Sequence, residues 1–321
     1  MSLTTNEKKD KIYYDVTITN PHDANQEKAL NFEETRDKNI LDNQEDFQVA
    51  LTKMYINSDS IPLFKFRKEK YKITMEKLKN DETFDKQEFK ILNFDGKFIF
   101  RIDQFIRIIN DALEELHQRL FKTDATKNLV PFIKYDPSTK LLSIFKILNN
   151  NVKQNIFFNH FLAFFFRGLN HEFLSLNGDK SIKFLFDNPA NINKTSISGK
   201  IYVKSTENFS RIIYWRNILR IIIQTNINIR NNKIGNQENT GVVENEANIL
   251  DIIPINNNLK FPIVVKDSSN REFVDIIGRG FLKQFSFQVL IEDFEKNKFP
   301  LFIQNGSTSI FEFLFIKKDN V

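Results

Sequence analysis

Phe285-Ser286-Phe287-Gln288-Val289-Leu290-Ile291-Glu292 and Ser309-Ile310-Phe311-Glu312-Phe313-Leu314-Phe315-Ile316-Lys317 are the two segments that decide the fold. In both, large apolar residues recur at every second position, which places them on one face of a β-strand. The second segment is apolar on its other face as well, so it belongs inside a β-sandwich or beneath a partner subunit. We therefore predict a β-sandwich with these core residues: Phe285, Phe287, Val289, Ile291, Phe311, Phe313 and Phe315.

The same alternation recurs along the chain, with turn residues between the runs. It predicts strands at 12–18, 47–55, 63–66, 71–75, 89–94, 98–100, 132–135, 141–145, 182–186, 200–203, 209–228, 263–265 and 273–277. Asn305-Gly306 precedes the final strand, and we expect the two segments quoted above to form a closing hairpin. Many short strands of this kind indicate an all-β fold.

One stretch has a helical pattern instead. Apolar residues between Ile102 and Leu120 recur at helical spacing, with charged residues on the opposite side. We predict one prominent amphipathic helix there, packed on an end or flank of a sheet. Residues 156–166 fit either a buried strand or a short helix, and the helix is favoured. The region around 101–170 can form an insertion domain within residues 11–321.

Composition restricts the function. The net charge of +5 is spread along the chain, which argues against a dedicated nucleic-acid surface. Residues 1–10 are predicted to be a mobile arm, in which Lys8 and Lys9 could contact nucleic acid. The Asn-rich stretch 231–248 is predicted to be a long exposed loop. Because the chain has no cysteine, no apolar signal segment and no apolar run long enough for a membrane span, we expect assembly inside a cell and no secretion.

The sequence contains no recognisable catalytic pattern. The four histidines, His22, His117, His160 and His171, do not fall at metal-ligand spacing on a recognisable element. There is neither a glycine-rich phosphate loop nor a Gly-x-Ser-x-Gly elbow. We therefore expect no catalytic residue, no metal, no cofactor and no small-molecule substrate. A jelly-roll enzyme of the cupin kind would need clustered histidines and carboxylates.

Several segments together resemble the penton, or minor capsid, proteins of virophages and of Polinton-like and adinto-type DNA viruses. The similarity lies in Phe32–Asp37, Ile40–Asn43, the strand from Phe47, Ile156–Asn159 followed by Phe161-Leu162, Arg220–Asn228, Phe273–Ile276, Asp293, Phe299–Leu301, Gly306 and Phe311–Lys318. No single piece is specific, but together they cover nearly the whole chain.

The resemblance implies a jelly-roll β-sandwich that forms a homopentamer at the vertices of an icosahedral virion. Its partner there would be the double-jelly-roll major capsid protein of the same virus. The Phe-rich strands and the lack of catalytic residues, considered without the resemblance, also indicate a protein that assembles with other subunits. The alternative is a viral spike or a receptor- or carbohydrate-binding β-sandwich, which would need an exposed aromatic or polar pocket on its loops.

Overall fold

The computed structural model describes residues 10–21, 28–79, 81–94, 96–121, 129–148, 153–176, 178–186, 193–197, 199–215, 217–230, 248–255, 263–266 and 272–318. The predicted arm at 1–10 and the predicted loop at 231–248 lie almost entirely outside this part of the chain. The chain forms two compact units. The first, the sandwich unit, is Met1–Ile61 with Ile218–Val321, and the second, the inserted unit, is Pro62–Asn217. The region around 101–170 lies inside the inserted unit, whose bounds are wider.

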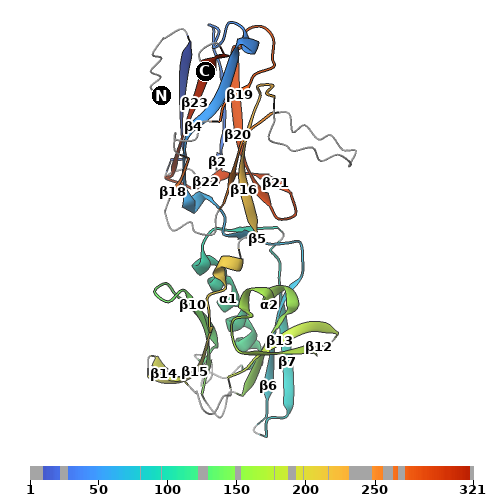
Figure 1. Cartoon of the computed structure of the whole chain (residues 1–321). Coiled ribbons are helices and arrows are strands. Elements are labelled where there is room, and N and C mark those ends of the chain that lie inside the picture. Colours follow the sequence, from blue (N-terminus) through green and yellow to red (C-terminus); the bar gives the residue numbers. More distant parts are fainter. Residues whose placement is uncertain are drawn as a thin grey trace. The chain divides into compact units, whose positions relative to one another are not determined.

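The sandwich unit has two antiparallel sheets (Figure 1). Sheet one has the order β1 (Lys11–Thr19), β23 (Thr308–Lys317), β4 (Phe47–Asn57) and β18 (Ile263–Lys266), with β19 (Val274–Asp275) also on β4. Sheet two runs β17 (Ile249–Pro254), β16 (Ile218–Thr225) and β20 (Gln284–Asp293), and both β3 (Asn31–Thr35) and β21 (Lys298–Pro300) pair with β20. The short elements are β2 (Lys28–Ala29), β22 (Phe302–Ile303), η1 (Gln44–Asp46) and η2 (Ser58–Ser60).

The strand order identifies the fold as a jelly roll. Eight strands, β1, β3, β4, β16, β17, β18, β20 and β23, are shared between the two sheets, and only β16 and β17 are consecutive strands of one sheet. Counted in chain order, sheet one holds the first, eighth, third and sixth strands, and sheet two the fifth, fourth, seventh and second. Two four-stranded antiparallel sheets connected in this order make the double Greek key of a jelly roll. The predicted all-β jelly-roll sandwich is therefore confirmed.

The core of the sandwich unit lies between β20 and β23. All seven of the core residues named from the sequence are buried here, at 0–3% exposure. The ring of Phe313 lies 5.0 Å from that of Phe285 at 79°, and 4.9 Å from that of Phe287. The two strands thus face one another across the core, and the predicted closing hairpin is wrong. Both edges of β23 are already paired, one with β1 and the other with β4.

The inserted unit has two further antiparallel sheets. One runs β14 (Asn193–Ile197), β15 (Lys200–Thr206), β10 (Leu141–Ile147) and β9 (Phe132–Asp136). The other runs β12 (His171–Leu176), β13 (Asp179–Phe184), β11 (Gln154–Asn159), β6 (Tyr71–Leu78) and β7 (Phe84–Leu92). The remaining elements are the pair β5 (Phe64–Lys65) and β8 (Phe98–Ile99), the helices α1 (Ile102–Leu120) and α2 (His160–Phe166), and η3 (Ile212–Tyr214).

Helix α1 spans the residues predicted for it, and the prediction is confirmed. It contacts β6 and β7 of one sheet and β9 of the other, so its apolar face fills the space between the two sheets. The buried side chains of that face are Phe105, Ile106, Ile109, Ala112, Leu113, Leu116 and Leu120. An amphipathic helix with one wide apolar stripe is suited to this position.

The helix favoured at 156–166 is only partly correct, because the chain changes from strand β11 to helix α2 at Asn159. The Asn159 Oδ1 accepts hydrogen bonds from the Leu162 N–H (3.3 Å) and from the Lys72 N–H (3.1 Å). Its Nδ2 donates to the Lys70 carbonyl at 2.6 Å. One side chain therefore caps α2 and fixes the start of β6 next to it. Similarly, the strand predicted over 209–228 begins only at Ile218.

Candidate functional site

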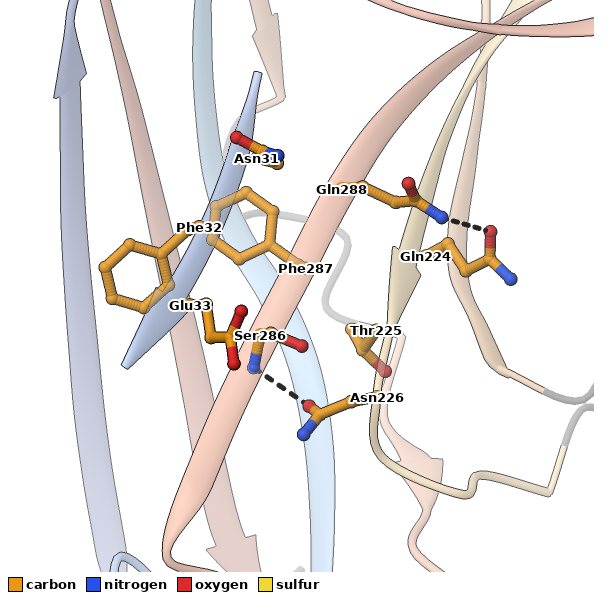
Figure 2. A pocket seen from close by; sticks show the side chains of 9 residues that line it. All are labelled: Asn31, Phe32, Glu33, Gln224, Thr225, Asn226, Ser286, Phe287 and Gln288. Carbon is orange, nitrogen blue, oxygen red and sulfur yellow. Dashed lines mark hydrogen bonds between the residues drawn. The ribbon is translucent and has the colours of Figure 1, made fainter. Parts of the chain in front are cut away.

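The outer face of sheet two carries a polar hollow of about 510 Å³ (Figure 2). It follows from the alternation of β3 and β20. Phe32 and Phe287 point into the sandwich, where their rings stack at 5.7 Å, so the residues on either side of each point outward. The outward side chains form two rows across the strands. One row is Asn31, Gln288 and Gln224, and the other is Glu33, Ser286 and Asn226.

Hydrogen bonds between strands hold these side chains in place. Gln288 Nε2 donates to Gln224 Oε1 at 3.0 Å. Asn226 Oδ1 accepts from the Ser286 N–H at 2.9 Å, and its Nδ2 donates to the Gln284 carbonyl at 3.1 Å. The Asn226 side chain thereby continues the pairing of β16 with β20 beyond the end of β16. A surface of carboxamides with one carboxylate, that of Glu33, offers hydrogen-bond donors and acceptors to a polypeptide partner.

Beyond the hollow, the same face of sheet two becomes apolar and then ionic. Leu290 lies opposite Ile222, and Glu292 lies opposite Arg220. Arg220 donates from Nε to Glu292 Oε1 at 2.8 Å and from Nη2 to Oε2 at 3.2 Å. The Glu292 side chain is only 2% exposed. This two-bond geometry satisfies a carboxylate that would otherwise be buried without a partner.

The outer face of sheet one is chemically different. Asp15 lies opposite Glu312, which in turn lies opposite Lys53. Partial burial and then the Glu312 charge raise the pKa of Asp15, while Lys53 lowers it. Tyr13, on the same face as Asp15, is 38% exposed. The two outer faces of the sandwich therefore differ: that of sheet one carries both acidic and basic side chains, and that of sheet two is rich in carboxamides.

The histidines considered from the sequence occupy separate, ordinary environments. His117 is buried on α1 and stacks on Phe121, while His160 packs against Phe161. His171 has Nδ1 at 2.7 Å from the Leu169 carbonyl. His22 lies outside the described residues. Within the described ranges, no three His, Cys, Asp or Glu side chains are placed to hold a metal ion.

The sequence analysis missed both the hollow and the Arg220–Glu292 pair. The polar positions Gln284, Ser286 and Gln288 of the deciding strand do predict an outward-facing row. They do not indicate which strands lie beside that row, and the neighbours determine whether a hollow forms. Among the described helices, none is long and apolar enough to cross a membrane.

Comparisons with known proteins establish the fold. No protein-family model matches the sequence, and neither does any curated protein. Solved structures do match. A chain in the 3.5 Å cryo-EM structure of the Sputnik virophage has a TM-score of 0.66 and 16% identity, over 97% of this chain and 98% of that chain. The crystal structure of the mavirus penton protein has a TM-score of 0.62 and 16% identity, over 96% of this chain and 99% of that one.

Proposed function

We propose that this chain is a structural capsid protein that forms the vertex, or penton, of an icosahedral virus particle. The observation that carries the proposal is the extent of the structural likeness. It covers 96% of this chain and 99% of the mavirus penton protein, so it includes the inserted unit as well as the jelly roll. A jelly roll alone would say little, because that fold serves many unrelated functions.

A vertex role calls for five copies around a five-fold axis. A closed ring requires a heterologous interface, in which one patch meets a different patch on the next copy. The sandwich unit offers two such patches, since the outer faces of its sheets differ in chemistry. Five chains of 37.9 kDa would give a particle of roughly 190 kDa. Beside the ring we place the major capsid protein of the same virus, and we assign the chain to the virion, assembled within the infected cell.

Two other roles are less well supported. A spike or receptor-binding protein would need a pocket on its loops, whereas the hollow described above lies on strands of sheet two. An enzyme would need a catalytic constellation. The structural neighbours are a penton protein and a virophage structure, which favour an assembly function over both. The arm at 1–10 could still contact nucleic acid.

Cryo-electron microscopy of the native particle tests the proposal. Density for this chain is expected at the vertices alone, five copies to each. A monomer in dilute solution would not contradict the vertex role, because in a particle each copy is also held by its major-capsid neighbours. Trimers on the facets, or absence from the particle, would contradict it.

A further inference from the structure

The last segment of the inserted unit, residues 207–217, is firmly anchored at its end; we call it the connector. Trp215 is 2% exposed, and its Nε1 donates to the Phe165 carbonyl at 3.1 Å. The side chain of Asn217 accepts from the Lys65 N–H at 2.9 Å and donates to the Lys65 carbonyl at 2.8 Å. The connector therefore has a fixed attachment next to β5 and α2.

At the start of the connector, Glu207 is buried with only half of its carboxyl group satisfied. Its Oε2 accepts from the Leu142 N–H at 2.9 Å, and its own N–H donates to the Leu142 carbonyl. Its Oε1 is buried and has no hydrogen-bond partner among the described residues. This oxygen lies against Gly168, where an added Cβ would approach it to 2.6 Å. Burial raises the pKa of Glu207 to about 7, while the Leu142 N–H and Arg211 act in the opposite direction.

Four residues further on, Arg211 also has an unsatisfied group. Its Nε is buried without a hydrogen-bond partner in the described part of the chain. Its guanidinium carbon lies 5.9 Å from the centre of the Phe209 ring and 5.8 Å from that of Tyr214. Those rings are 55% and 57% exposed. The connector thus holds a buried carboxyl oxygen and a buried guanidinium nitrogen, and neither has a hydrogen-bond partner among the described residues.

We propose that the connector is a proton-operated switch with two arrangements. When Glu207 carries a proton, Arg211 rests against Phe209 and Tyr214, as in this structure. When Glu207 is ionised, Arg211 turns to Glu207 Oε1, and the two exposed rings lose their cation.

The physical reason is the cost of a buried carboxylate with one oxygen unsatisfied. A charge-assisted hydrogen bond from Arg211 removes that cost, whereas a cation over exposed rings is a weak contact. Two elements pack against Glu207: β10 contributes the Leu142 amide, and the turn after α2 contributes Gly168. Arg211 is the charged group whose field acts on Glu207.

The switch changes the surface formed by Phe209 and Tyr214. Phenylalanine, tyrosine and arginine are residue types enriched at protein interfaces. Releasing the rings changes what that surface can bind when the pH passes through neutrality. This inference goes beyond the proposed vertex role and does not depend on it.

Trp215 provides a fluorescence signal for this change, because it is the one tryptophan of the chain and directly follows Tyr214. The experiment follows Trp215 emission of the full chain between pH 5.5 and 8.5. The native protein should change with a midpoint between the ordinary glutamate pKa of 4.5 and 7, because burial raises the pKa of Glu207 to about 7 and the Arg211 hydrogen bond of the ionised arrangement lowers it again. Glu207→Gln should keep the low-pH spectrum throughout. Arg211→Met should move the midpoint to higher pH, since the ionised state loses its partner. Glu172→Gln, on exposed β12, is the matched control and should titrate like the native protein.

Carbon-13 NMR follows the titration of the Glu207 carboxyl group directly, so this second measurement does not require Glu207→Gln to fold. The Arg211→Met variant helps to assign the Glu207 signal. A titration midpoint near 4.5 would overturn the proposal. So would a raised midpoint with no change in Trp215 emission, because protonation would then occur without rearrangement. A transition that persists in folded Glu207→Gln would overturn it as well.

Discussion

Phe313→Ala is the sharpest test of the sandwich core. The side chain is fully buried at the centre of β23, where it contacts the rings of Phe285 and Phe287 from the opposite sheet. Truncating a buried phenylalanine removes its transfer free energy and leaves a cavity, at a cost of about 3–5 kcal/mol. The two lost ring contacts, at about 0.5–1.5 kcal/mol each, are consistent with the upper half of that range.

Hydrogen exchange of the β4 and β23 amides measures this loss in the sandwich unit itself. A factor of ten in protection corresponds to about 1.4 kcal/mol, so Phe313→Ala should lower protection roughly a hundred- to several-thousand-fold. Phe281→Ala is the matched control, because it makes the same chemical change at a residue that is 64% exposed. That variant should stay within about 0.5 kcal/mol of the native protein. Equal protection in the two variants would refute the core assignment.

Three further predictions concern other parts of the structure. Arg220→Met should lower the free energy of unfolding in urea by about 3 kcal/mol, because it leaves Glu292 buried without a partner. The double variant Arg220→Met/Glu292→Met should recover much of this loss. A double variant as unstable as the single one would contradict the pairing. Asn159→Ala should destabilise the inserted unit by about 3 kcal/mol, since the α2 cap and two further hydrogen bonds are lost. Urea unfolding followed by Trp215 fluorescence measures this change. A change under about 0.5 kcal/mol would contradict the role of Asn159 as cap and strand anchor. Because the folded pKa of Glu207 is raised to about 7, the folded state holds a proton that the unfolded chain releases above 4.5, so stability falls as pH rises through this window. The Trp215-monitored melting temperature should therefore be higher at pH 5.5 than at pH 8, and Glu207→Gln should remove most of that difference.

Features set by neighbouring residues could be predicted from the sequence. The bounds of α1 follow from the spacing of its apolar residues, and the burial of Phe311 and Phe313 follows from alternation along one strand. Both patterns are local and need no knowledge of the partner.

Features set by distant residues could not be predicted. Nothing in β20 or β23 states that they lie in opposite sheets, because alternation gives the buried face of a strand but not its neighbours. The change from β11 to α2 was missed because apolar density is the same on both sides of Asn159, and only the hydrogen bonds of that side chain mark the boundary. The hollow on sheet two needs three strands, β3, β16 and β20, that are remote from one another in the chain.

The position of β23 between β1 and β4 has a consequence for synthesis on the ribosome. Sheet one pairs residue 11 with residue 316, so its central strand is the last of the eight to be translated. The described core residues of the inserted unit lie between Leu63 and Trp215, so this core can form earlier, since domains generally fold as units while the chain emerges. Until β23 is made, β1 has no neighbour to pair with in sheet one, and β4 can pair only through its other edge, with β18 and β19. The long-range pairing that completes this sheet is slow. A chain cut short before β23 would therefore carry a folded inserted unit beside a sandwich whose β1 and β4 edges lack their partner strand, and such unpaired edges favour aggregation.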